Sequence, residues 1–251
     1  MKDKTGHLNL KPSGGDLISE SYLMDCMNGM REYPDKYFDL AIVDPPYGLD
    51  LANMNMGVGK SKKASKIKNR KWKPKDWDKN APLENFFLEL WRVSKEQIIW
   101  GGNYFELPPC KHYIIWDKEI PEGLSFADCE FAWTSFDKAP RMFRHSAYLE
   151  KKDKFHPTQK PIKLYDWICQ RYAEPGQKVI DTHLGSGASR IAAHKNGLHF
   201  VGFEIDEEYY YSQEERFKTY LSQPTLFDLP RAVGVLNSNA PTLNFEQSTE
   251  L

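Results

Sequence analysis

The segment from Lys178 to Lys195 constrains the fold of this 251-residue chain more than any other. It begins with a short apolar run that ends in Asp181, continues through a loop that contains Gly185 and Gly187, and enters a helix-forming stretch. A strand, a glycine-rich loop and a helix in this order are typical of a nucleotide-binding unit, because glycine lets the backbone approach a ligand closely. The next apolar run ends in Glu204, which is placed to hold two ribose hydroxyls. The sequence therefore predicts an α/β protein with a nucleotide site at these strand ends.

The glycine loop alone does not identify the ligand, because a nicotinamide or flavin cofactor would use similar parts. The third position of the dinucleotide fingerprint holds Arg190, where a small residue is needed for close packing of helix on strand. This disfavours a dinucleotide, and an oxidoreductase remains the alternative that the loop leaves open.

The second informative segment is Asp44-Pro45-Pro46-Tyr47, which follows an apolar run from Phe38 to Val43. The exocyclic amino group of adenine or cytosine is a poor nucleophile, because its lone pair is delocalised into the ring. The Asp44 carboxylate and the Pro45 carbonyl could each accept one N–H bond and localise that lone pair, while Tyr47 stacks on the extruded base. Two prolines fix φ and remove backbone donors, which preorganises the carbonyl. The alternative is an ordinary turn after a buried strand.

Together with Phe155-His156-Pro157-Thr158-Gln159-Lys160-Pro161, these segments resemble the β group of S-adenosylmethionine-dependent DNA amino-methyltransferases. The three motifs also agree in order: the Asp-Pro-Pro-Tyr segment comes first and the glycine loop last, which is the permuted order of that group. The resemblance covers about Leu17 to Leu221. It implies a Rossmann-like methyltransferase sheet with helices on both faces and a small inserted target-recognition region.

The resemblance also implies a role for each matching residue. Asp44, Pro45, Pro46 and Tyr47 would be catalytic, and the cofactor would be held by Asp25, Thr158, Lys160, Asp181, Gly185, Ser186, Gly187 and Glu204. Thr158 and Lys160 would hold the methionine moiety, Glu204 the ribose and Asp25 the adenine ring. Thr182-His183 stands where the family commonly has Pro-Phe, which bears on cofactor affinity rather than identity.

The expected reaction is site-specific methyl transfer to adenine N6 of a flipped-out base, with S-adenosylhomocysteine as the product. In the resembling group, aspartate rather than serine at the first catalytic position favours adenine, and cytosine N4 remains the alternative. Two further alternatives belong to other classes: an RNA methyltransferase, and an inactive module that binds only DNA and a clamp.

The charge balance restricts how double-stranded DNA could be bound. Lys and Arg number 34 against 35 Asp and Glu, so a nucleic acid must be attracted by a local patch rather than by net charge. A basic loop at about 57–80 supplies one, with Lys60, Lys62, Lys63, Lys66, Lys68, Arg70 and Lys71 as expected phosphate contacts. The alternative is a solvated loop.

Target recognition is expected at about 118–154, the stretch that separates the catalytic motifs. Arg141 and Arg144 lie there among aromatic residues, and arginine can read guanine edges in a bidentate manner. The alternative is a surface hairpin that covers the sheet.

The end of the chain carries a separate motif. Gln223-Pro224-Thr225-Leu226-Phe227 resembles the docking peptide of the bacterial sliding clamp, in which Gln223 orients the peptide while Leu226 and Phe227 fill pockets. The alternative is that the two apolar side chains fold back onto the body.

The domain organisation follows from these segments: a methyltransferase domain over 1–222 and a flexible tail over 223–251. The amino terminus lacks the apolar core of a signal peptide, so a cytoplasmic protein without membrane contact is expected. The four cysteines are scattered and predict no metal site. The resembling group often forms dimers, so a homodimer is also an expectation, although no interface pattern stands out.

The apolar runs also predict the main elements. Strands are expected at Phe38 to Asp44, Gln97 to Trp100, His112 to Trp116, Glu130 to Phe136, Lys178 to Asp181 and His199 to Glu204, and helices at Asn85 to Val93, Pro161 to Tyr172 and Glu207 to Leu221. The strands are expected to form a parallel sheet assembled out of chain order. Asn103, in a segment that follows one of them, is a candidate polar contact or a turn residue.

Overall fold

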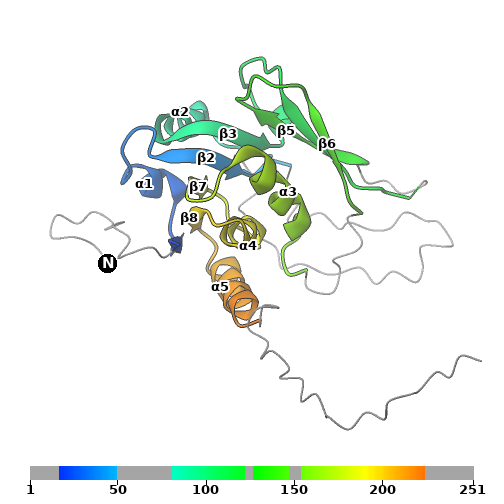
Figure 1. Ribbon diagram of the computed structural model, residues 1–251. Helices are drawn as coiled ribbons and strands as arrows, with labels where there is room; N and C mark the ends of the chain where they lie inside the picture. Colours follow the sequence, from blue (N-terminus) through cyan, green and yellow to red (C-terminus); the bar gives the residue numbers. More distant parts are fainter. Residues whose placement is uncertain (1–16, 50–80, 122–126, 147–153, 224–251) are drawn as a thin grey trace, which may run out of the picture.

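The computed structural model describes residues 17–49, 81–121, 127–146 and 154–223. They contain an eight-stranded sheet in the order β1-β8-β7-β2-β3-β5-β4-β6 (Figure 1). The strands are β1 Ser19–Leu23, β2 Phe38–Val43, β3 Ser94–Trp100, β4 Tyr113–Asp117, β5 Cys129–Thr134, β6 Arg141–Arg144, β7 Lys178–Asp181 and β8 His199–Glu204. The helices are α1 Cys26–Met30, α2 Glu84–Val93, α3 Ile162–Tyr172, α4 Ala188–Lys195 and α5 Glu207–Leu221, with a 3₁₀ turn, η2, at Gly102–Tyr104.

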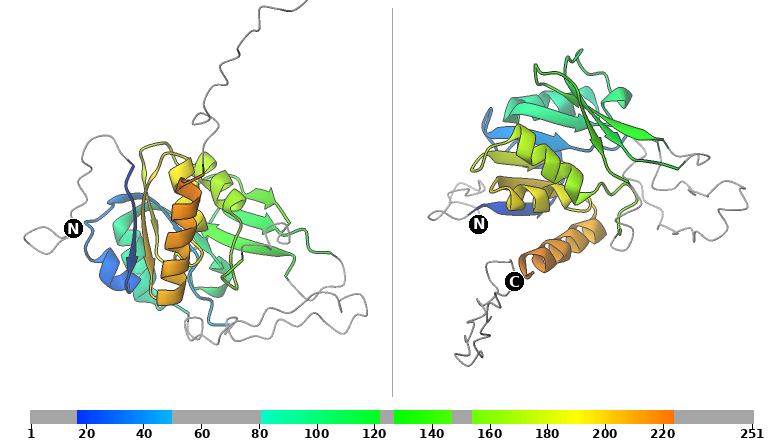
Figure 2. Two further views of the ribbon diagram at one scale, coloured as in Figure 1. Left: turned by 90° about the horizontal axis from the view of Figure 1, so that it is seen from below. Right: turned by 45° about the vertical axis from the view of Figure 1, so that its right-hand side comes forward.

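Helices cover both faces of the sheet, as expected from the sequence (Figures 1 and 2). Strand β2 shows why, because its side chains alternate between two buried clusters. Leu40 and Ile42 pack in the cluster that contains residues of α3 and α4, whereas Ala41 and Val43 pack in the cluster that contains residues of α1 and α2. The core therefore lies on both sides of β2, and the α/β class is confirmed.

The expectation of a parallel sheet is correct for the pairings among β1, β8, β7, β2 and β3 and for β4 with β6, and it is wrong for β5. Strand β5 runs antiparallel to both of its neighbours, β3 and β4. The reason is that the chain reverses after β4 and β5 then enters the sheet between β4 and β3. The stretch 118–154, expected to be an insertion, thus contributes β5 and β6 to the sheet itself.

The sheet positions the predicted motifs at one edge. Strands β7 and β2 are neighbours and parallel, although the chain leaves β7 towards β8 and leaves β2 towards β3 on the opposite side. Such a reversal of strand order opens a crevice at the carboxyl ends of the strands. Asp181 ends β7 and Asp44 follows β2, so the crevice lies between the two motifs.

Several predicted contacts involve residues that the structure does not describe or that lie at the end of the described chain. The basic loop with its seven predicted phosphate contacts lies outside the described residues, as do Leu226 and Phe227 of the tail. Gln223 is described and lies exposed just after α5. Among the helices that the structure describes, none has the length and apolar character needed to cross a bilayer.

Candidate active site

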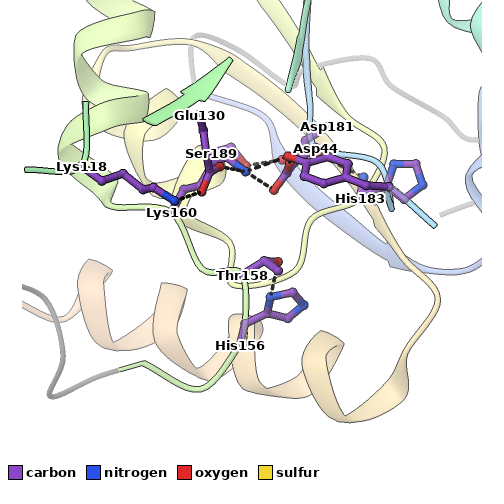
Figure 3. Close-up of polar contacts among 10 residues, drawn as sticks. Asp44, Lys118, Glu130, His156, Thr158, Lys160, Asp181, His183 and Ser189 are labelled. Carbon is purple, nitrogen blue, oxygen red and sulfur yellow. Dashed lines mark hydrogen bonds and ion pairs between the residues drawn. The ribbon is translucent and has the colours of Figure 1, made fainter. Parts of the chain in front are cut away.

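The glycine loop is fixed from behind by Asp181. Its carboxylate accepts a hydrogen bond from Ser189 Oγ at 2.5 Å and from the backbone N–H of His183 at 3.0 Å (Figure 3). Gly185 and Gly187 have φ of +50° and +69°, a region that favours glycine. Burial raises the pKa of Asp181 to about 7. These bonds hold the loop in a tight turn before α4.

Glu204 ties the end of β8 to the same loop. One carboxylate oxygen accepts the N–H of Gly185 at 2.7 Å, and the other accepts the N–H of Asp206 at 2.9 Å. The residue is buried, and burial raises its pKa. A carboxylate can accept about four hydrogen bonds, so both oxygens keep capacity for ligand hydroxyls.

A cavity of about 250 Å³ lies at the carboxyl ends of β1, β8, β7 and β2. It brings together eight of the predicted residues: Asp25, Asp44, Pro46, Thr158, Lys160, Gly185, Ser186 and Glu204. Pro45, Tyr47, Asp181 and Gly187 are predicted residues that do not line it. Asp25 has a second role, since it caps α1 by accepting the N–H of Asn28 at 3.1 Å.

The residues of the cavity wall fit S-adenosylmethionine in their chemistry. Met24, Phe203 and Ile205 form apolar surface that suits an adenine ring, and Ile205 is 64% exposed despite its apolar side chain. Glu204 lies between the last two and offers acceptors to ribose hydroxyls. Which of these residues touch the cofactor stays a prediction.

The segment with the His-Pro-Thr-Gln-Lys-Pro motif forms one wall as a compact turn. His156 Nδ1 lies 3.2 Å from Thr158 Oγ1 (Figure 3), and its ring packs edge-on against Tyr209 at 4.3 Å between centroids. The Gln159 side chain accepts the N–H of Phe155 at 3.2 Å. The turn delivers Lys160 into the interior, just before Pro161 caps α3.

At the mouth of the crevice, the Asp44 carboxylate accepts hydrogen bonds from two side chains. Tyr47 donates its hydroxyl to Asp44 Oδ1 at 2.7 Å, and Lys160 Nζ lies 2.5 Å from Oδ2. Burial raises the pKa of Asp44 in spite of the neighbouring ammonium. Lys160 therefore lines the cavity with its charge turned towards Asp44, and its expected contact with the methionine moiety stays a prediction.

The ring of Tyr47 is held by the segment that follows β3. It stacks on Tyr104 with ring centroids 4.8 Å apart and an interplanar angle of 16°. Gly101 passes beneath it so closely that an added Cβ would lie 2.1 Å from the ring. The candidate polar contact Asn103 is exposed and does not line the cavity.

Two charged residues that the sequence analysis did not assign complete the site. Glu130 of β5 lies 3.1 Å from Lys160 Nζ, and Lys118 Nζ lies 3.3 Å from Glu130 (Figure 3). Burial alone would raise the pKa of Glu130, but Lys160 and Lys118 hold it below its ordinary value. Likewise, burial alone would lower the pKa of Lys160, but Asp44 and Glu130 raise it. The ion pairs therefore link Asp44, Lys160, Glu130 and Lys118 in a chain in which acidic and basic side chains alternate.

His183 lines the cavity, whereas the two recognition arginines lie elsewhere. His183 packs edge-on against Phe86 at 5.4 Å, and burial lowers its pKa to about 4, so it is neutral and serves packing. Arg141 and Arg144 are exposed on the outer strand β6, where Arg144 lies 3.4 Å from Asp117. They do not line the cavity, and their contact with DNA stays a prediction.

The comparison with known families decides which family the chain belongs to. A family described as DNA methylase, of the N6/N4 type, matches residues 58–215, well over half of the chain. The chain belongs to this DNA methylase family. S-adenosylmethionine is the methyl donor of the family, in agreement with the cavity.

Relatives of this DNA methylase share modest identity with it. A Type II methyltransferase, M2.DpnII of Streptococcus pneumoniae, is 29% identical over 136 residues, which is 53% of this chain and 46% of the relative. The putative methylase YubD of Escherichia coli K12 is 23% identical over 215 residues, which is 76% of this chain and 87% of that protein. The chain thus spans about half the length of the first relative and most of the second.

Solved structures confirm the Rossmann-like methyltransferase fold of this DNA methylase. The M1.HpyAVI–SAM complex superposes with a TM-score of 0.52 at 19% identity, over 78% of this chain and 98% of the other. The PvuII cytosine-N4-specific DNA methyltransferase also gives 0.52, at 14% identity, over 80% of this chain and 87% of the other. The fold is therefore shared with an enzyme whose title gives cytosine N4 as its target.

Proposed function

We propose that this protein transfers the methyl group of S-adenosylmethionine to the N6 amino group of an adenine flipped out of double-stranded DNA. The observation that carries the proposal is the single cavity that joins Asp44 of the Asp-Pro-Pro-Tyr segment to Glu204 and the glycine loop. A base that enters at Asp44 and a cofactor held at Glu204 would share this cavity. Proximity of this kind is a large part of catalysis in a two-substrate reaction.

The residues around Asp44 prepare the amino nitrogen for attack. The carboxylate and the Pro45 carbonyl accept the two N–H bonds and localise the lone pair, and Tyr47 stacks on the base. When bound, the cofactor supplies an electrophilic methyl group: the nitrogen lone pair forms the N–C bond while the C–S bond breaks and its electron pair stays on sulfur. The nitrogen is then cationic, and the Asp44 carboxylate, which accepts one of its N–H groups, can take the proton that the nitrogen must lose.

Adenine N6 is the finer part of the proposal. Its support is the aspartate at the first catalytic position, Asp44, which in the resembling group favours adenine over cytosine. One of the similar structures is titled a cytosine-N4-specific enzyme, and cytosine N4 is the second candidate because both amines fit the same pair of acceptors.

We also propose DNA contacts and partners beyond the cavity. The basic loop would contact phosphates, and Arg141 and Arg144 would contact the target sequence. Gln223, Leu226 and Phe227 would dock on a sliding clamp. A homodimer is a further proposal from the resembling group.

The test of the mechanism is Asp44→Asn, which keeps the size of the side chain but removes its charge. Methyl transfer to duplex DNA should fall by about 100-fold or more, the scale of a lost preorganised charge, while binding of S-adenosylhomocysteine, measured by calorimetry, stays near the wild-type value. Asp35→Asn, an exposed carboxylate with 78% of its side chain accessible, is the matched control. Substantial turnover by Asp44→Asn would rule out the assigned role.

A further inference from the structure

The Asp44 carboxylate is already engaged in the structure. Tyr47 donates to one oxygen and Lys160 to the other, at 2.7 and 2.5 Å. The proposed reaction requires this carboxylate to accept an N–H of the target base. Each oxygen keeps capacity for a further hydrogen bond, but the two donors already present compete with the base for it. The ammonium holds its oxygen through charge as well as a hydrogen bond and is the stronger competitor.

Lys160 has a second carboxylate within reach. Its side chain is 3% exposed, and an ammonium so buried is costly without a partner. Glu130 Oε2 lies 3.1 Å from Nζ, on the side away from Asp44 (Figure 3). The ring of Trp100 lies 5.2 Å from the same ammonium and adds a cation–π contact. Lys160 thus bridges the two carboxylates, and a small movement of Nζ away from Asp44 would keep its ion pair with Glu130 without exposing the charge.

Glu130 is itself held in place by the β4–β5 hairpin. It faces Trp116 across the two strands, and Lys118, just beyond that partner, binds its other oxygen. Glu130 therefore stays fixed while Lys160 moves.

We propose that Glu130 is a positioning residue that receives the Lys160 ammonium when the target amino group takes its place on Asp44. This inference rests on the proposed function, because it assigns Glu130 a part in the methyl transfer carried out at Asp44. It goes beyond that function in naming a residue that touches neither base nor cofactor and controls when Asp44 is available.

The other titratable groups around Lys160 leave this exchange to the two carboxylates. Tyr47 and Tyr165 face the cluster, and burial raises the pKa of each well above its ordinary value, so both stay neutral. Asp181 of β7 bonds with Ser189 and the glycine loop. Lys118 is the remaining basic side chain of this group of residues, and it binds Glu130 rather than Asp44.

The test is Glu130→Gln, which keeps the shape of the side chain and its ability to accept a hydrogen bond. Lys160 is then left with one carboxylate and remains on Asp44. Turnover at neutral pH should fall by about tenfold or more, because a buried charge pair now has to be broken, while the affinity for S-adenosylhomocysteine changes by less than about twofold.

The pH profile separates this role from simple support of the fold. Without the Glu130 charge, Lys160 loses its proton at a lower pH than in the wild type, which frees Asp44. Turnover of Glu130→Gln should therefore recover towards wild type as the pH rises. A merely structural role would lower the melting temperature and leave turnover per folded molecule, and the shape of the pH profile, unchanged.

Two further variants complete the experiment. Glu130→Asp keeps the charge but moves it away from Lys160, because the side chain is one methylene shorter. Turnover should therefore fall less than in Glu130→Gln and should also recover as the pH rises. This variant replaces Glu130→Gln if the latter does not fold. Glu32→Gln, an exposed glutamate that precedes β2, is the control and should match wild type. Turnover of the Glu130 variants within about twofold of wild type at every pH, or a loss equal at every pH, overturns the inference. A wild-type protein that methylates no DNA overturns the proposed function itself.

Discussion

Gly101→Ala tests whether the backbone beneath Tyr47 sets the position of the catalytic ring. Gly101 has φ of +69°, where an L-residue costs about 1–2 kcal/mol. Its new Cβ would also lie 2.1 Å from the Tyr47 ring, which must therefore move. Moving it disturbs the stack on Tyr104, worth about 0.5–1.5 kcal/mol, and the hydrogen bond to Asp44, worth a similar amount, about 0.5–1.5 kcal/mol.

Gly176→Ala is the matched control, because it introduces the same backbone strain at positive φ without a clash between the new Cβ and another residue. Gly176 has φ of +85°, and an added Cβ would meet nothing within 4 Å. In both variants backbone strain should lower the free energy of unfolding by about 1–2 kcal/mol. In Gly101→Ala the displaced ring should lower it by about 1–3 kcal/mol more. At about 2–4 °C per kcal/mol for a chain of this size, the difference is measurable by thermal unfolding.

The activity of the two variants should differ more sharply than their stability. Gly101→Ala should reduce methyl transfer to duplex DNA by about tenfold or more, because a displaced ring no longer receives the base. Gly176→Ala should retain wild-type turnover per folded molecule. Equal melting temperatures and equal turnover for the two variants would refute the reasoning.

Three further predictions concern other parts of the account. Glu204→Gln should weaken binding of S-adenosylhomocysteine by about tenfold, or about 1.4 kcal/mol, in calorimetry, and unchanged affinity would remove Glu204 from the ribose site. Burial raises the pKa of Asp181 to about 7, so the folded state binds a proton that the unfolded chain has released, and the resulting stabilisation is present below about pH 4 and is lost as the pH rises through 7. The free energy of unfolding of wild type minus that of Asp181→Asn should fall over this range in urea titrations, and a flat difference would contradict the pKa. Replacement of Lys60, Lys62, Lys63 and Lys66 by alanine should weaken DNA binding and flatten its salt dependence while sparing cofactor binding, and unchanged affinity at low salt would exclude the basic loop as a phosphate contact.

The main strands and helices follow from local pattern in the sequence. The run before Asp44 is apolar at every position but one, as befits a strand buried on both faces, and helix α3 begins after Pro161 as expected. The motifs then determine the site, because residues after parallel strands meet at one edge of the sheet. Asp44, Gly185 and Glu204 could be brought together on this reasoning alone.

What the sequence did not predict depends on pairing between distant segments. Glu130 meets Lys160 only because β5 enters the sheet antiparallel beside β3, and it meets Lys118 only through the register of the β4–β5 hairpin. The direction in which a strand such as β5 enters the sheet has no local signature in the sequence. Tyr104 directly follows Asn103, which was a candidate contact, but the stack of Tyr104 on Tyr47 depends on how η2 folds.

The most direct measurement is methylation of a mixed-sequence duplex DNA library with S-adenosylmethionine, followed by nucleoside mass spectrometry of the digested product. N6-methyladenine formed by the wild type and absent with Asp44→Asn is the predicted result. N4-methylcytosine would keep the mechanism and replace the base, whereas a library without any methylated base, from protein that binds the cofactor, would contradict the account.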